Sequence, residues 1–155
     1  MKLATVFAFV LAAVGANASP AGKRLACAEA SRFGDLQVVP SDLQPGTDFT
    51  IHVDFECAVE YFGIIPRYTD FYIEVPSGNN GHEPPILLAR RDFTLPAPPL
   101  SPALTFTAQL PYYPVYFEGA SYNIALNTIY PVNGTDGSEI LVQGGVYAPI
   151  NVTSS

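Results

Sequence analysis

FTIHVDFE, residues 49–56, is the stretch of this chain that decides its fold. Apolar side chains occupy every second position, and polar or acidic side chains occupy the positions between them. A period of two is typical of a β-strand with one face buried and the other in water. Pro45 and Gly46 precede the stretch and form a turn, because their backbone angles suit one. We therefore predict a β-strand whose odd-numbered side chains face the core.

The same period continues on both sides of this stretch. Six further segments show it, at residues 36–39, 70–75, 86–91, 104–110, 122–127 and 140–152. Gly144-Gly145 predicts a bulge or bend in the last of them. No long helical pattern follows the first 25 residues, and 26–33 form at most a short turn. Tyr122 stands where a tyrosine corner of an immunoglobulin-like domain would lie. We predict an all-β domain over residues 35–155, an immunoglobulin-like or fibronectin-like antiparallel β-sandwich of about seven strands.

Residues 1–18 have the pattern of a secretory signal peptide. Lys2 gives a positive start, about a dozen mainly apolar residues follow, and Ala16-Asn17-Ala18 matches the small-x-small cleavage pattern. The apolar run is too short to span a bilayer. We expect cleavage before Ser19 and a secreted, extracellular protein in which residues 19–34 form an N-terminal arm.

Removal of the signal peptide leaves an acidic protein. Six basic and fourteen acidic side chains give a net charge of −8. Lys23-Arg24 is a candidate dibasic processing site, and cleavage after it leaves four basic side chains and a net charge of −10; two solvated side chains are the alternative interpretation. So few cations argue against nucleic acid and anionic membranes as partners. The polar residues 152–155 lack the apolar tail of a lipid-anchor signal, so we expect no membrane anchor.

Cys27 and Cys57 are the only cysteines of the chain. Two thiols in an oxidising compartment most simply pair, and a free nucleophilic thiol is the alternative. Nothing close to either cysteine in the sequence resembles the base that such a nucleophile needs. We predict a disulfide between them, which stabilises the fold by about 3–4 kcal/mol on the chain-entropy model.

Two N-glycosylation sequons lie in the exported part, at Asn133-Gly134-Thr135 and Asn151-Val152-Thr153. We predict glycosylation at Asn133 and Asn151. Asn133 lies in a glycine-rich turn and is the better acceptor, whereas Asn151 is close to the C-terminal end.

Two groups of polar side chains are candidates for chemistry. His52, Asp54 and Glu56 share one face of a strand with about 6.5–7 Å between successive members, an arrangement that suits a metal ion or a solvated face. Asp70 and Glu74 share a face as well, but lie about 13 Å apart along the strand. Paired carboxylates of glycoside hydrolases need separations near 5.5 Å or about 6.5–9.5 Å.

Known catalytic motifs are missing from the sequence. It contains no G-x-S-x-G elbow, no H-E-x-x-H, no phosphate-binding glycine loop and no nucleotide fingerprint. We therefore predict no catalytic residues, no cofactor and no metal. A metal-dependent hydrolase at His52, Asp54 and Glu56 remains an alternative.

Aromatic side chains gather in two loops and form the candidate ligand surface. Tyr61 and Phe62 belong to one loop, and Tyr112, Tyr113 and Tyr116 belong to the other. Sugar rings stack on aromatic faces, so a carbohydrate-binding module is one alternative; an exposed tyrosine patch equally suits a protein partner. The sequence is compatible with both loops at one end of the sandwich or at opposite ends.

The chain resembles small secreted proteins of mushroom-type fungi that carry one immunoglobulin-like domain. The resemblance rests on the short signal peptide, the dibasic arm, the Pro45-Gly46 entry into an alternating strand, and Tyr-Asn-Ile-Ala-Leu at 122–126. It implies location and fold, but no chemistry. We therefore expect a non-enzymatic protein that acts by surface binding in the cell wall, the extracellular matrix or at a host interface. Its partners would be a cell-wall polysaccharide or an extracellular protein.

Overall fold

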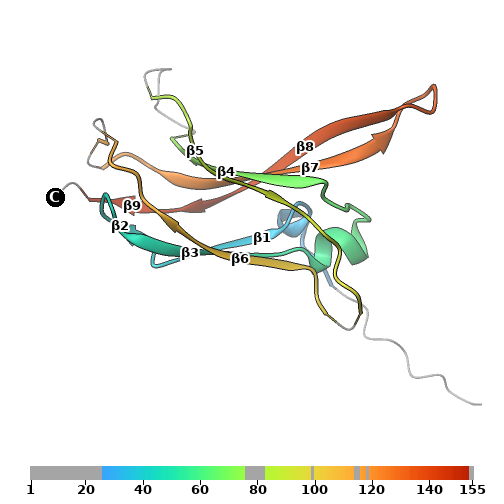
Figure 1. Ribbon diagram of the computed structural model, residues 1–155, viewed down its shortest axis with the longest axis horizontal. Helices are drawn as coiled ribbons and strands as arrows, with labels where there is room; N and C mark the ends of the chain where they lie inside the picture. Colours follow the sequence, from blue (N-terminus) through green and yellow to red (C-terminus); the bar gives the residue numbers. More distant parts are fainter. Residues whose placement is uncertain (1–25, 76–82, 99, 114–115, 118, 154–155) are drawn as a thin grey trace, which may run out of the picture.

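Two β-sheets lie face to face in the computed structural model (Figure 1). The structure describes residues 26–75, 83–98, 100–113, 116–117 and 119–153. The predicted signal peptide and the candidate processing site Lys23-Arg24 lie outside these residues, as does a glycine-containing segment at 76–81 that the sequence predicts to be a turn after the segment at 70–75.

Seven strands of five or more residues form the two sheets of the described chain. The first sheet has the order β1-β3-β6, with bounds Asp35–Val39, Asp48–Asp54 and Ala103–Gln109. The second has the order β5-β4-β7-β8, with bounds Ile86–Asp92, Tyr68–Glu74, Asn123–Asn133 and Glu139–Pro149. Neighbouring strands in both sheets are antiparallel. The prediction of an all-β antiparallel sandwich is confirmed; its immunoglobulin-like character remains a prediction.

Short elements complete the fold. Strand β2 (Asp42–Leu43) pairs in parallel with β9 (Asn151–Val152), an interaction that the sequence did not predict. A 3₁₀ turn, η1, covers Glu29–Ser31, within the short turn expected at 26–33. A π-helical turn, η2, covers Cys57–Tyr61 after β3. No helix in the described part of the chain is long and apolar enough to cross a membrane.

The alternation in residues 49–56 divides the side chains as predicted. Phe49, Ile51 and Val53 of β3 are at most 2% exposed, whereas Thr50 on the other face is exposed. Burial of each such side chain contributes about 1.5–3 kcal/mol. The two sheets meet in the core, where the rings of Phe71 and Phe106 lie 4.9 Å apart in an edge-to-face arrangement.

The predicted bulge or bend at Gly144-Gly145 is wrong. Strand β8 runs through both glycines, which pair in unbroken register with Thr128 and Asn127. The ring of Phe33 lies where a side chain at Gly144 would be. The glycine is therefore needed for close packing against an aromatic ring rather than for a break in the strand.

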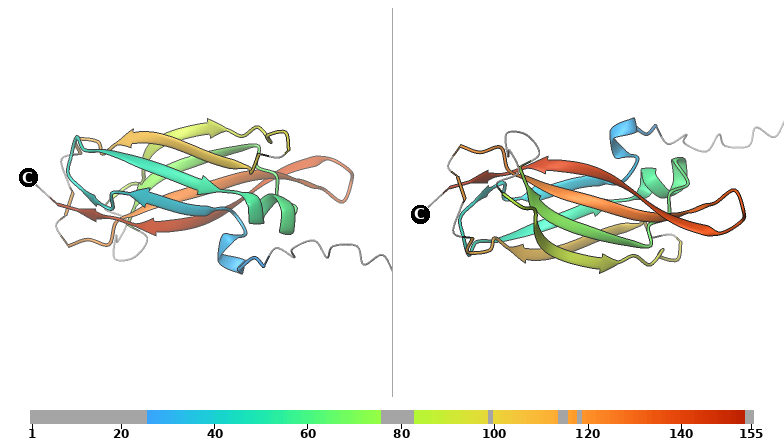
Figure 2. Two further views of the ribbon diagram at one scale, coloured as in Figure 1. Left: turned by 90° about the horizontal axis from the view of Figure 1, so that it is seen from below. Right: turned by 90° about the horizontal axis from the view of Figure 1, so that it is seen from above.

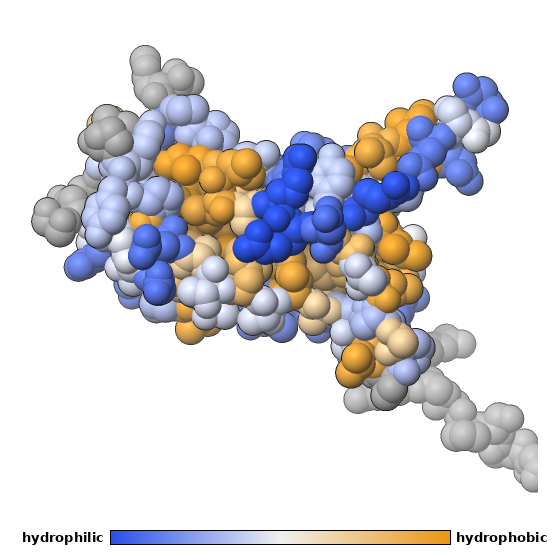
Figure 3. All heavy atoms as spheres, in the orientation of Figure 1, coloured by the Kyte–Doolittle hydropathy of each residue, from blue (hydrophilic) through white to orange (hydrophobic). Residues whose placement is uncertain are grey.

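Strands β7 and β8 form a hairpin that projects beyond the sandwich (Figures 1 and 2). The sequence predicted a strand only to residue 127, but β7 continues to Asn133. Strand β4 stops pairing with β7 at Ile129, so beyond that point β7 pairs only with β8. Val132, Ile140 and Leu141 are therefore partly exposed, and Figure 3 shows apolar side chains along this projection.

Tyr122 anchors the entry to β7. Its side chain is 1% exposed, and its hydroxyl accepts a hydrogen bond of 2.9 Å from the backbone nitrogen of Phe117. This bond to the backbone upstream is the contact that a tyrosine corner makes. Burial raises the pKa of Tyr122 to about 12.

The end of the N-terminal arm is fastened to the sandwich. The Thr128 hydroxyl donates a hydrogen bond of 2.7 Å to the Phe33 carbonyl oxygen. Gly34 adopts a φ of 120° and lies against Val53 and Phe55, where a side chain would not fit. The described part of the arm therefore packs on the domain that follows it.

Candidate functional site

The predicted disulfide between Cys27 and Cys57 is confirmed. The two Cα atoms lie 5.7 Å apart, within the usual range for a disulfide. The bond joins the segment before η1 to the first residue of η2. It therefore fixes the N-terminal segment beside the turn that follows β3.

His52 and Asp54 engage different partners, and the contact of Glu56 is made by its backbone nitrogen. The His52 Nδ1 atom lies 2.7 Å from the hydroxyl oxygen of Thr105 on β6. The Asp54 carboxylate accepts a hydrogen bond of 2.7 Å from the backbone nitrogen of Glu56, which lies beyond the end of β3. Among the described residues, no three histidine, cysteine or acidic side chains lie together as ligands for a metal ion.

Asp70 is bound to an arginine rather than paired with Glu74. Its side chain accepts two hydrogen bonds from Arg90 on β5, at 2.6 and 2.7 Å. A bidentate pair of this kind is among the strongest of charge-assisted contacts. The carboxylate is only 5% exposed, so Asp70 holds Arg90 in place and is not available as a general acid or base.

The two aromatic loops lie at opposite ends of the sandwich. In the antiparallel register of β3 and β6, Asp48 pairs with Gln109 and Asp54 pairs with Ala103. The loop that leaves β3, with Tyr61 and Phe62, is therefore at the other end from the loop that leaves β6. The five candidate residues do not form one surface.

Each loop also mixes exposed and packed rings. In the first loop Tyr61 is 57% exposed, while Arg32 lies over the ring of Phe62. In the second loop Tyr112 is 82% exposed. Tyr116 packs edge-to-face between Tyr113 and Tyr122, with ring centroids 5.6 and 5.4 Å apart.

Tyr116 is a half-buried member of the candidate ligand surface. Its hydroxyl is buried, and it has no hydrogen-bond partner among the described residues. Burial raises the pKa of this hydroxyl well above the ordinary tyrosine value. Tyr116 therefore contributes to packing, and Tyr112 is the member of this loop that presents its ring to solvent.

The outer face of the β5-β4-β7-β8 sheet is a site that sequence reasoning missed. One row of directly opposite residues crosses it, Leu87–Tyr72–Ala125–Tyr147. Leu87 and Tyr147 are each 55% exposed, whereas Ala125 between the two tyrosines is 1% exposed. The row is an apolar band in which the small Ala125 side chain lies buried between the two tyrosines. We name this row the tyrosine band.

Arg90 lies in the next row, opposite Asp70. Its guanidinium carbon is 4.5 Å from the ring centroid of Tyr68, and its side chain is 58% exposed. The hydrogen bonds to Asp70 raise the pKa of Arg90 above its ordinary value. The pKa of Tyr72 is raised by burial and by the nearby Asp70 charge. An oriented cation therefore lies beside the tyrosine band.

The outer face of the β1-β3-β6 sheet is different in character. Gln37, Thr50, His52, Thr105 and Thr107 lie on it, and they are exposed or half-buried polar side chains. Val39, opposite Thr50, is an exposed apolar side chain on the same face. The two outer faces thus differ, one mainly polar and one aromatic. The sequence does contain a signal for the aromatic face. Tyr68 and Tyr72 occupy non-core positions of the strand that became β4, and Arg90 lies in the following strand, β5.

The two sequons lie in different surroundings. Asn133 is exposed at the last residue of β7, beside the turn of the projecting hairpin. Asn151 is in β9, and its side-chain nitrogen donates a hydrogen bond of 3.1 Å to Asp42. The side-chain nitrogen of Asn133, to which a glycan would be attached, is therefore exposed to solvent. The corresponding nitrogen of Asn151 is hydrogen-bonded to Asp42.

No protein-family model and no curated protein matches the chain. Among solved structures, the chain is similar to superoxide reductase (neelaredoxin) from Ignicoccus hospitalis, at 14% identity and a TM-score of 0.41, over 77% of this chain and 80% of that one. A variant of the same protein matches at 14% identity and a TM-score of 0.43, over 80% of this chain and 82% of that one. Similarity at this level carries no argument about function.

Proposed function

We propose that this chain is a secreted, non-enzymatic protein that acts by surface binding, with the outer face of the β5-β4-β7-β8 sheet as the contact surface. The observation that carries the proposal is the difference between the two outer faces. One face is mainly polar, and the other bears the tyrosine band beside an oriented arginine.

The composition of this face suits binding. Tyrosine and arginine are enriched in the centres of protein interfaces and supply most of their binding energy. Arg90 is already held by Asp70 and Tyr68, so little conformational entropy remains to be lost when a partner binds. A face built on paired strands also changes little on binding, which favours a preformed contact.

Secretion is supported by the signal-peptide pattern in residues 1–18 and by the disulfide between Cys27 and Cys57. The net charge of −8 after removal of residues 1–18 favours partners that are neutral or basic. A cell-wall polysaccharide or an extracellular protein fits both conditions, and an anionic membrane does not.

Binding is tested with purified protein and immobilised cell-wall polysaccharide and extracellular-protein fractions from the producing organism. Tyr147→Ala and Leu87→Ala remove exposed parts of the tyrosine band, and we expect each to weaken binding about tenfold or more. Thr107→Ala, on the polar outer face, is the matched control and leaves binding unchanged. Equal binding by all four proteins contradicts the proposal, as does a reproducible turnover abolished by one point substitution.

Carbohydrate binding is the second candidate, favoured by two tyrosines that flank Ala125 about 10 Å apart across two strand spacings. Glycan-array binding by variants distinguishes the tyrosine band from the loop after β6 as the location of a sugar site. Loss of sugar binding in Tyr147→Ala places it on the tyrosine band, and loss in the double variant Tyr112→Ala, Tyr113→Ala places it on the loop after β6. A blank array removes this candidate.

A further inference from the structure

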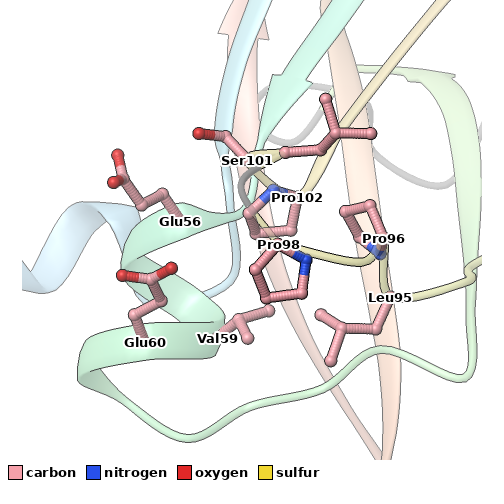
Figure 4. A pocket seen from close by; sticks show the side chains of 9 residues that line it. Glu56, Val59, Glu60, Leu95, Pro96, Pro98, Ser101 and Pro102 are labelled. Atoms are coloured by element: carbon pink, nitrogen blue, oxygen red, sulfur yellow. The ribbon is translucent and has the colours of Figure 1, made fainter.

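A groove lies between η2 and the proline-rich segment that connects β5 to β6 (Figure 4). Its volume is about 270 Å³. Small-molecule sites have about 300–1,000 Å³, so this groove suits a few side chains rather than a whole ligand of that class. The apolar part of its lining consists of Val59, Leu95, Pro96, Pro98, Leu100 and Pro102.

Two carboxylates and Ser101 complete the lining of this groove. Figure 4 shows Glu56 and Glu60 together on one side of the prolines. Neither forms an ion pair with any residue that the structure describes. Like charges four residues apart on a helical turn destabilise it, so a cation between them is favourable. The groove therefore combines apolar walls with an uncompensated charge of −2.

The N-terminal segment reaches the protein at this place. Cys27 is bonded to Cys57, which directly follows Glu56. Ala26, the first described residue, lines an adjoining hollow together with Glu56 and Cys57. The described part of the N-terminal arm thus begins beside the acidic side of the groove.

We propose that the groove holds the chain's own Lys23-Arg24 segment. Lysine and arginine bury their aliphatic stems on apolar surfaces while their charged ends reach acidic groups, which matches the lining. Two residues lie between Arg24 and Cys27, and the three Cα–Cα steps that join them span up to about 10 Å. The Cα atoms of Cys27 and Cys57 are 5.7 Å apart, and Glu60 lies about 5 Å further along the helical turn, so both carboxylates lie within the distance that the connecting chain and an arginine side chain can span.

The tether strengthens this intramolecular contact. A short flexible connection gives an effective concentration in the millimolar range, so a contact with a dissociation constant of about 0.1 mM is enough to fill the groove. Cleavage after Arg24 removes the dibasic pair and opens the groove. Processing of the arm would then change which surface of the protein is accessible.

The test compares two forms of the oxidised protein, one that starts at Ser19 and one that starts at Leu25. The probe is a fluorescent peptide with the sequence of residues 19–25, SPAGKRL, and its anisotropy is measured. We expect the Leu25 form to bind the probe about tenfold more tightly than the Ser19 form, where the tethered segment competes. Lys23→Ala with Arg24→Ala in the Ser19 form restores binding.

The acidic side chains are tested in the Leu25 form. Glu56→Gln with Glu60→Gln weakens probe binding about tenfold, while Glu74→Gln with Asp92→Asn, which removes the same charge elsewhere, leaves it unchanged. Half-molar salt weakens binding to the unsubstituted Leu25 form. Equal affinity of the Ser19 and Leu25 forms, or the same loss in both double variants, overturns the proposal.

Discussion

Asp70 and Arg90 lie directly opposite each other on β4 and β5 and are joined by two hydrogen bonds of 2.6 and 2.7 Å. The carboxylate is on the outer face of its sheet, yet it is only 5% exposed. A charge removed from water in this way is stable only while its partner remains. The pair therefore both stabilises the sheet and orients the arginine of the proposed contact surface.

Replacement of Arg90 tests the first of these roles. Arg90→Met leaves the Asp70 carboxylate without its partner, so we expect the melting temperature to fall by several degrees. Arg91→Met is the matched control, because Arg91 is exposed and its contacts involve no buried charge: its guanidinium donates a hydrogen bond to the Arg90 carbonyl oxygen and lies 4.5 Å from the ring centroid of Phe106. Thermal unfolding followed by circular dichroism measures both. A fall in Arg91→Met as large as in Arg90→Met would contradict the assignment.

The packing of Phe33 on Gly144 predicts a second effect. Gly144→Ala places a methyl group where the Phe33 ring lies, and overpacking of this kind costs about 1–3 kcal/mol. Gly145→Ala is milder, because its nearest neighbour, at 3.0 Å, is the side-chain oxygen of Asn127. Denaturant unfolding measures the difference. Phe33→Ala in the Gly144→Ala background removes the clash, so the two substitutions should cost less together than the sum of their separate effects.

Stability should fall at high pH because of Tyr122. Its hydroxyl has an ordinary pKa of 10.0, and burial raises the pKa in the folded protein to about 12. The folded state therefore favours the neutral hydroxyl, and the resulting contribution to the free energy of unfolding is fully present below pH 10. As pH rises from 10 to about 12 the unfolded state ionises first, and about 2 kcal/mol of stability is lost.

Urea unfolding at pH 8, 10 and 12 measures this loss. Tyr122→Phe is less stable at pH 8, because the Phe117 backbone nitrogen loses its acceptor. The same variant should lose less stability between pH 10 and 12. An equal loss in both proteins would show that other groups cause the alkaline effect.

The disulfide closes a loop with a sequence separation of 30 residues. Replacement of Cys27 and Cys57 by serine should lower the free energy of unfolding by about 3–4 kcal/mol on the chain-entropy model. Reduction of the unsubstituted protein with dithiothreitol should give a similar change. A loss confined to the serine variant would indicate that the half-buried surroundings of the cysteines, rather than the bond, set the effect.

Strand positions were predictable from this sequence because they depend on local alternation, as Phe49, Ile51 and Val53 illustrate. Strand partners were not, because pairing joins distant segments. The opposite placement of Tyr61 and Tyr112 follows from the β3–β6 register, which no local pattern contains. The same holds for Arg90 and Asp70, and for Phe33 and Gly144. The disulfide was predictable because the chain offers only one pair of cysteines.

Asn133 and Asn151 should differ in glycan occupancy. The glycan is attached to the side-chain nitrogen of asparagine, which in Asn151 donates a hydrogen bond to Asp42 within the β2–β9 pair. Asn133 is exposed beside the hairpin turn. We therefore expect most of the glycan at Asn133 in protein secreted by a eukaryotic host. Mass spectrometry of peptides after enzymatic deglycosylation measures occupancy at each site.

Substitutions in and beside the sequons test whether the folded structure around each asparagine, rather than the sequon alone, determines its glycan occupancy. Thr135→Ala should remove nearly all of the glycan mass, whereas Thr153→Ala should change it little. Asp42→Ala releases the Asn151 side chain and should raise occupancy there, because its sequon is otherwise intact. If Asn151 is fully occupied in the unsubstituted protein, the transfer precedes formation of the β2–β9 pair, and the folded geometry does not control it.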